Sequence, residues 1–103
     1  FNTNVVKGAL VRIAEQYATQ ARQGNVEVLA IGKKGAEAMQ RRGFRVNTQF
    51  RDVFSALSFA NVRGAAEHVM DEFEKGRYDV VEIIYNEFKN VATQIVRAEQ
   101  MLP

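Results

Sequence analysis

Apolar residues recur every three or four positions in the first part of the chain, which is typical of a helix with one buried face. The predicted helix runs from Val5 to Ala21, and Gly24 can adopt the left-handed backbone that often ends a helix. We expect Asn2 to cap its start, because the side-chain oxygen can accept a free amide of the first turn. The residues expected to be buried are Val6, Leu10, Ile13, Tyr17 and Ala21.

The next segment has the pattern of a strand, a helix and a second strand. Val26–Ile31 is a nearly continuous apolar run, as expected for an internal parallel strand covered on both faces. Lys34–Arg42 has helical spacing and is closed by Gly43, and Phe44–Thr48 then alternates like a strand. The segment Phe50–Ala60 is ambiguous, and we interpret it as a loop.

The last part of the chain predicts a helix followed by two strands. The helix begins near Asn61 and ends at Gly76, and Tyr78–Tyr85 is a strand with Ile83 in the core. A short link, Asn86–Asn90, then favours an antiparallel return over residues 91–101. The helix residues expected to be buried are Val62, Ala66, Val69 and Phe73.

Alternating helices and strands predict an α/β sandwich with a mostly parallel sheet and one antiparallel edge strand. A chain of 103 residues with 47% apolar residues suits one domain over residues 1–103. The 14 basic and 12 acidic residues leave a net charge of +2, too small to indicate nucleic-acid binding. No apolar run approaches the roughly 20 residues that span a bilayer, so we expect no direct membrane insertion.

Two polar segments resemble ligand-binding motifs. Gly32–Gly35 lies between a strand and a helix, where backbone amides can hold a phosphate. The longer glycine-rich patterns of phosphate loops and dinucleotide sites are absent, so we favour a tight turn with two solvated lysines. A small doubly wound nucleotide- or phosphate-binding module stays the alternative. Asn86 and Asn90 follow a strand, where open sheets often bind ligands, but asparagines are also ordinary turn formers and we favour that role.

The remaining polar residues give little indication of an enzyme. His68 lies beside the buried stripe of its helix, and with no second histidine and no cysteine we interpret it as a surface residue without metal. A hydrolase triad would join it to Asp52 and either Ser55 or Ser58, but neither serine has a nucleophile-elbow motif. A phosphoacceptor receiver domain would need an aspartate at the carboxyl end of a strand, whereas Asp52 is in a predicted loop and Asp79 starts a strand.

Basic residues concentrate in the middle of the chain. A solvated face is the ordinary interpretation. The functional alternative is a docking patch for acidic loops of a partner, since clustered arginines raise association rates and orient complexes. The residues of this candidate patch are Lys33, Lys34, Arg41, Arg42, Arg45 and Arg51.

Four segments, Phe1–Val5, Ile31–Gly35, Val80–Asn90 and Gln100–Pro103, follow one another in a specific order. Taken together, they resemble the globular part of the gamma subunit of F-type ATP synthases, and the resemblance extends over essentially the whole chain. In that family a first strand precedes the Phe-Asn motif, and long N- and C-terminal helices form a coiled coil. We therefore expect this sequence to be an excised piece without that strand and those helices.

The resemblance implies a Rossmann-like three-layer sandwich that serves as the non-catalytic foot of the rotating central stalk. Such a domain couples rotation of an ion-driven ring to ATP synthesis at catalytic sites on other subunits. The implied partners are the epsilon subunit, the membrane ring of c subunits, and the alpha and beta subunits through the long helices. The implied location is peripheral to an energy-transducing membrane, on the cytoplasmic face of the bacterial inner membrane. No catalytic residue, cofactor or metal is expected.

Overall fold

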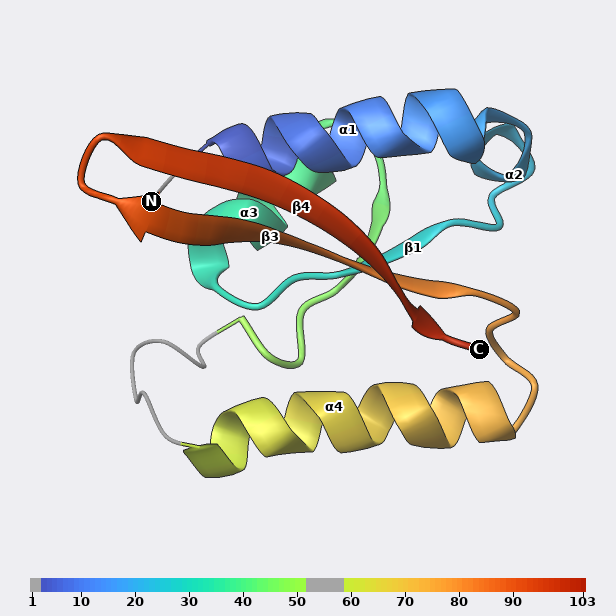
Figure 1. The fold of residues 1–103 in the computed structure, drawn as a ribbon. Helices are drawn as coiled ribbons and strands as arrows, with labels where there is room; N and C mark the ends of the chain where they lie inside the picture. Colours follow the sequence, from blue (N-terminus) through green and yellow to red (C-terminus); the bar gives the residue numbers. More distant parts are fainter. Residues whose placement is uncertain (1–2, 52–58) are drawn as a thin grey trace.

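The computed structural model describes residues 3–51 and 59–103, which form a mixed α/β arrangement (Figure 1). In chain order the elements are α1 (Asn4–Gln16), α2 (Ala18–Arg22), β1 (Glu27–Leu29), α3 (Lys33–Arg41), β2 (Arg45–Asn47), α4 (Phe59–Glu74), β3 (Val81–Asn90) and β4 (Thr93–Leu102). Figure 1 shows α1 and α4 on opposite sides of the strands, with α3 behind the β3–β4 pair in that view. The α/β class predicted from the sequence is therefore confirmed.

The strands form two separate pairs. β1 and β2 are parallel and joined through α3, with Val28 opposite Val46, which confirms the predicted strand, helix and strand unit. β1 is shorter than predicted, and Ile31 beyond it is 40% exposed. The arrangement differs from the single, mostly parallel sheet predicted, because no ladder joins the two pairs within residues 3–51 and 59–103. Strand patterns are local, whereas the alignment of two pairs depends on contacts between residues far apart in the chain.

A small apolar core lies between α1, α3 and the β1–β2 pair. Its most buried members, Val6, Ala38 and Met39, are 7%, 6% and 3% exposed. The apolar stripe predicted for the first helix is confirmed in part, because Val6 is buried while Leu10, Ile13, Tyr17 and Ala21 are only partly buried. Partly buried side chains surround this core: Ala9, Leu10, Ile13, Val28, Phe44 and Val46.

The first helix is shorter than the predicted Val5–Ala21. α1 ends at Gln16, Tyr17 takes φ −132° and ψ 23°, and α2 follows as a separate short helix. The Tyr17 hydroxyl donates to the carboxylate of Glu82 on β3, a contact that helical periodicity does not encode. Gly24 has the predicted positive φ, at 74°. The predicted cap, Asn2, lies outside the described residues.

α4 begins at Phe59, earlier than predicted, so the end of the predicted loop is helical; residues 52–58 of that loop lie outside the description. Among residues 62–74 of this helix the most buried is Ala65, at 2% exposure, whereas Val62, predicted to be buried, is 44% exposed. The face of α4 that is buried therefore includes Ala65 and not Val62, so it is turned relative to the predicted face. The other three predicted residues are partly buried. Gly76 ends the segment with φ 76°, as predicted.

The β3–β4 hairpin is longer than predicted. β3 starts at Val81 rather than Tyr78 and continues to Asn90, so the predicted link Asn86–Asn90 belongs to the strand. The turn follows at residues 91–92, where the Asn90 side-chain oxygen accepts the backbone N–H of Ala92 at 2.9 Å. The antiparallel return and the turn-forming role of Asn90 are thus confirmed, while the position of the turn moves towards the C-terminus.

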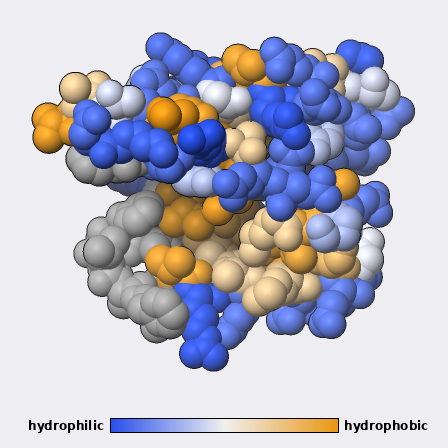
Figure 2. Space-filling model, viewed as in Figure 1, coloured by the Kyte–Doolittle hydropathy of each residue, from blue (hydrophilic) through white to orange (hydrophobic). Residues whose placement is uncertain are grey.

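The two faces of this hairpin have different surroundings. Ile84 and Val96 face α1, and Val96 lies so close to Gly8 that a Cβ atom there would come within 2.6 Å of it. Successive side chains of a strand alternate between faces. Ile83 therefore points away from α1 and is 44% exposed, which corrects its predicted place in the core. Figure 2 shows apolar side chains in the hollow between the upper part of the molecule and α4.

Candidate docking surface

The structure separates the six basic residues of the predicted patch along α3 and β2. Lys33 and Lys34 begin α3, whereas Arg41 ends it about 12 Å further along the axis. Arg42 follows α3 directly, Arg45 starts β2, and Arg51 lies in the turn after β2. All are exposed except Arg51, which is partly buried. The patch is therefore an elongated surface and not one compact cluster.

Helical spacing brings part of this set onto one face of α3. Glu37 lies four residues after Lys33 and three after Lys34, and Arg41 lies four residues after Glu37, which places the four side chains on one face of the helix. Buried Ala36 and Met39 occupy a different side of the helix. The guanidinium of Arg51 lies 3.8 Å from the Glu37 carboxylate and adds a fourth cation to this face.

Arg42 and Arg45 have different surroundings. One guanidinium nitrogen of Arg42 donates to the backbone carbonyl of Ala38 at 3.1 Å, so Arg42 satisfies an acceptor in the last turn of α3. Arg45 lies opposite Glu27 in the β1–β2 register. The hydroxyl of Tyr78 donates to the Glu27 carboxylate at 3.1 Å. Burial and this neighbouring carboxylate raise the pKa of Tyr78 to about 12, so the hydroxyl stays protonated as a donor.

The glycine-rich segment Gly32–Gly35 is not the tight turn predicted, because Lys33, Lys34 and Gly35 already lie in the first turn of α3. Gly32 takes φ 112° directly before α3, a backbone conformation that favours glycine. Lys33 and Lys34 are exposed, which confirms that they are solvated, although they lie in a helix and not in a turn. Within residues 3–51 and 59–103, no group of three histidine, cysteine, aspartate or glutamate residues could hold a metal ion.

A polar cluster between α1 and β3 was not predicted from the sequence. Arg12 donates two hydrogen bonds to the Glu82 carboxylate, at 2.7 and 3.1 Å, and the Tyr17 hydroxyl donates to it as well. The Glu82 side chain is only 9% exposed. The hydrogen bonds from Arg12, and then from Tyr17, hold the pKa of Glu82 below its ordinary value although burial opposes them. One signal was available: Glu82 is the single charged residue of the run Val80–Tyr85, where a buried charge needs a partner.

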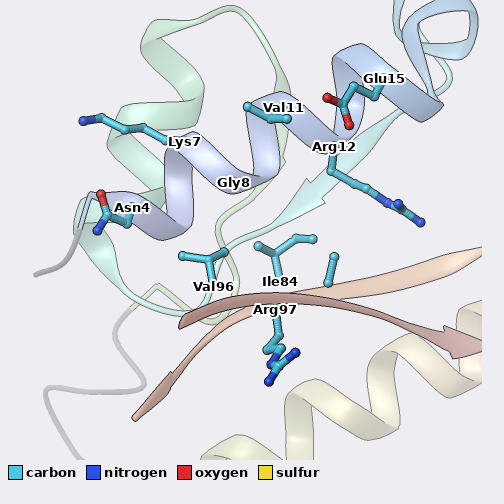
Figure 3. A pocket seen from close by; sticks show the side chains of 10 residues that line it. Asn4, Lys7, Gly8, Val11, Arg12, Glu15, Ile84, Val96 and Arg97 are labelled. Atoms are coloured by element: carbon cyan, nitrogen blue, oxygen red, sulfur yellow. The ribbon is translucent and has the colours of Figure 1, made fainter. Parts of the chain in front are cut away.

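Beside this cluster, a groove of about 340 Å³ runs between α1 and the hairpin (Figure 3). Figure 3 shows Ile84 and Val96 pointing towards α1, while Arg97 points away from it. Lys7 and Val11 lie on the α1 side of the groove, and Val11 is 53% exposed. The charged residues that line the groove are Lys7, Arg12, Arg97 and Glu15. Arg12 and Arg97 are paired with Glu82 and Glu87 of the same chain, so the candidate docking surface stays on α3.

The other polar residues singled out from the sequence have structural surroundings. His68 is partly buried and not a surface residue as predicted, because its ring lies 5.7 Å from the ring of Phe50 and its Nε2 is 3.3 Å from Asn47 Nδ2. Asp52, Ser55 and Ser58 of the hypothetical triad lie outside the described residues. Asn86 lies within β3 and is not the turn residue predicted; its Nδ2 donates to Gln94 Oε1 at 2.6 Å, across the hairpin.

Comparison with known proteins identifies the family. A family model described as ATP synthase matches residues 1–103. The ATP synthase gamma chains of Cytophaga hutchinsonii, Flavobacterium psychrophilum and Chlorobium phaeobacteroides are 52%, 47% and 35% identical over all 103 residues, which are 35%, 34% and 35% of those proteins. This chain belongs to the ATP synthase gamma chain family. The resemblance predicted from the four ordered segments is thereby confirmed.

The matched gamma chains are longer than this chain, which spans about one third of their length. Among the described residues, no helix is both long enough and apolar enough to cross a bilayer. The α3 surface and the Arg12–Glu82 cluster are thus features of one segment of a gamma chain.

Proposed function

We propose that this segment is the globular foot of the ATP synthase central stalk, a mechanical and docking element. It helps couple ion-driven rotation of a membrane ring to ATP synthesis at catalytic sites on other subunits. The observation that carries the proposal is the uninterrupted match of all 103 residues to gamma chains, at 52% identity in Cytophaga hutchinsonii. We propose that the segment itself is not catalytic.

The contacts of α1 support a mechanical role. α1 lies against the hairpin through the close approach of Gly8 to Val96 and through the hydrogen bonds of Arg12 and Tyr17 to Glu82. A polar cluster with charged hydrogen bonds holds its partners in one geometry. Force applied to the hairpin therefore reaches α1 without a flexible linker between them.

The proposal extends to fold, partners and location. The segment is one domain that completes a Rossmann-like three-layer sandwich within the whole gamma subunit. The exposed basic residues of α3 and β2 dock on partners, with the epsilon subunit and the ring of c subunits as candidates. The alpha and beta subunits are contacted through long helices outside this segment. The complex is peripheral to an energy-transducing membrane, on the cytoplasmic face of the bacterial inner membrane, which agrees with the bacterial sources of the relatives.

Reconstitution of the ATP synthase tests this role. We compare vesicles that contain the complex with full-length gamma subunit against vesicles whose gamma subunit lacks residues 1–103. We expect ATP hydrolysis by the alpha and beta subunits to persist and ion-driven ATP synthesis to be lost. The matched control is Lys75→Ala, an exposed position away from the basic surface, which should leave synthesis unchanged. Undiminished synthesis with the deletion would contradict the proposal.

A second assay separates this role from the alternative nucleotide-binding module. The isolated chain should neither hydrolyse ATP nor stimulate a hexamer of alpha and beta subunits, because α4, the longest helix among the described residues, spans only about 24 Å and cannot replace a shaft. Full-length gamma subunit serves as the positive control. Turnover by the chain alone, or calorimetric binding of nucleotide at millimolar concentration, would favour the nucleotide-binding module instead.

A further inference from the structure

The outward side of α3 carries an excess of positive charge that its own protein does not neutralise. The α3 outer face consists of Lys33, Lys34, Glu37 and Arg41, together with Arg51, whose guanidinium lies 3.8 Å from Glu37. Four cations thus surround a single carboxylate. No described carboxylate, Glu37 included, lies within 4 Å of Lys33, Lys34 or Arg41.

Basic residues elsewhere in the described part of the chain are often paired. Six of them lie within 4.0 Å of a carboxylate: Arg12, Arg63, Lys75, Arg77, Lys89 and Arg97. The sequence therefore places acidic partners beside many of its cations, while the α3 outer face keeps a net charge of +3. Charge that the fold leaves uncompensated on one face attracts an oppositely charged partner.

Helix stability does not account for the two lysines. Lys33 and Lys34 lie in the first turn of α3, where the positive end of the helix dipole disfavours cations, and no acidic residue lies in that turn. Arg41 in the last turn is favourable to the helix, so it has a structural role that the lysines lack. Residues that break a local rule without a local gain are expected where a protein binds something.

We propose that the α3 outer face binds an acidic protein segment of a neighbouring ATP synthase subunit. The segment carries at least two carboxylates about 12 Å apart, the axial distance from Lys33 to Arg41. One carboxylate pairs with Lys33 or Lys34 and the other with Arg41, on either side of Glu37. Ile31 lies two residues before Lys33 and is 40% exposed, which offers the same segment an apolar contact. This inference rests on the proposed function, because it requires neighbouring subunits.

The central carboxylate favours a protein segment over an anionic membrane. A membrane presents diffuse negative charge over its whole surface, which Glu37 would meet directly and repel. A segment with separate carboxylates can place them beside the lysines and Arg41 and leave Glu37 with Arg51. The arrangement of charge thus selects for discrete acidic side chains.

Carbodiimide cross-linking of the intact ATP synthase tests the inference, because the reagent joins a lysine amine to a carboxylate in contact with it. We expect mass spectrometry to find Lys33 or Lys34 joined to an aspartate or glutamate of another subunit. Lys75 and Lys89 are internal controls, because their amines lie 4.0 and 2.9 Å from Glu72 and Glu87 of the same chain. Links from Lys33 and Lys34 to Glu37 alone, or none while the controls react, would overturn the inference.

Charge reversal gives a second, independent measurement. In the full-length subunit, Lys34→Glu combined with Arg41→Glu should weaken retention of the subunit found by cross-linking about tenfold at low salt. The remaining retention should depend less on salt, because less charge attraction is left to screen. The matched control, Arg63→Glu, changes a paired, exposed arginine on α4 and should have no such effect. Unchanged retention in the double variant would overturn the inference. A double variant that binds phosphatidylglycerol vesicles less well than the unchanged subunit, with no link from Lys33 or Lys34 to another subunit, would also overturn it and would favour a membrane as the partner.

The outcomes also separate this inference from the proposed function. If ATP synthesis requires residues 1–103 but no link forms from Lys33 or Lys34, the inference is refuted and the proposed function is not. Synthesis that persists without residues 1–103 refutes the proposed function, whatever the cross-links show.

Discussion

The β1–α3–β2 region and the β3–β4 hairpin bury their residues in different ways. α3 and the short parallel pair bury apolar side chains, with Ala36 at 0% and Met39 at 3% exposure. The hairpin has strands of ten residues but leaves Ile83 at 44% exposure. It is fixed to α1 by a close glycine contact and by the polar cluster at Glu82. The stability of the first region thus depends on apolar packing. The hairpin is held by its close contact with Gly8 and by hydrogen bonds at Glu82.

The largest effect should come from a charge placed in the apolar region. Met39→Asp puts a carboxylate in the apolar core beside Val6 and Ala38. An unpaired buried charge of this kind should cost about 4 kcal/mol or more and unfold the chain. Circular dichroism during urea unfolding measures it. The control Met39→Leu conserves volume and should cost less than about 1.5 kcal/mol. A cooperative transition for Met39→Asp near that of the unchanged chain would show that this core is not where stability resides.

Replacing one glycine of α1 and one glycine of α3 with alanine should change the free energy of unfolding in opposite directions. A Cβ atom on Gly8 would lie 2.6 Å from Val96 Cγ1, whereas a Cβ atom on Gly35 would meet nothing within 4 Å. Gly8→Ala should therefore destabilise by about 1–3 kcal/mol despite better helix propensity. Gly35→Ala should stabilise by up to about 1 kcal/mol. The measurement is the free energy of unfolding in urea.

A compensating change sharpens the glycine comparison. Val96→Ala removes the methyl groups that a Cβ atom on Gly8 would meet, so it should recover part of the stability lost in Gly8→Ala. Purely additive free energies in the double variant would indicate that α1 is not seated on the hairpin at Gly8.

The contrast between the regions also explains what the sequence predicted. α3 was predicted as Lys34–Arg42 and found as Lys33–Arg41, because its helical spacing and the following Gly43 are local signals. The exposure of Ile83 was missed, because it depends on which face of the hairpin α1 covers. The Arg12–Glu82 cluster was missed for a similar reason, since 70 residues separate its partners. The basic residues of the candidate surface were predicted from composition, but their distribution along α3 required the structure.

The polar cluster predicts a pH-dependent contribution to stability. Because hydrogen bonds from Arg12 and Tyr17 lower the pKa of Glu82 in the folded chain, ionised Glu82 favours folding. The contribution is fully present above the unfolded-chain pKa of about 4.3 and is lost as the pH falls through the lower folded pKa. Glu82→Gln should cost roughly 1–2 kcal/mol at pH 7, from weaker hydrogen bonds, and less in acid.

The control for this prediction is an exposed ion pair. Glu67→Gln removes the partner of Arg63 at a site where the glutamate side chain is 55% exposed, so it should change stability little at any pH. Urea unfolding at several pH values between 3 and 7 measures both variants. A constant difference between Glu82→Gln and the unchanged chain over that range would show that the Glu82 carboxylate does not favour the folded state.

The smallest effect should come from repeating the aspartate substitution on the hairpin. Ile83 is 44% exposed on the face away from α1, so Ile83→Asp leaves its carboxylate in water and loses mainly strand propensity. We expect a cost of about 1 kcal/mol or less, compared with about 4 kcal/mol or more for Met39→Asp. Lys34→Ala, at an exposed position of α3, sets the scale of a neutral change, within about 0.5 kcal/mol. Parallel urea titrations of the three variants measure the contrast. If Ile83→Asp unfolds the chain as Met39→Asp does, the hairpin face opposite α1 is buried in solution, and apolar packing dominates both regions.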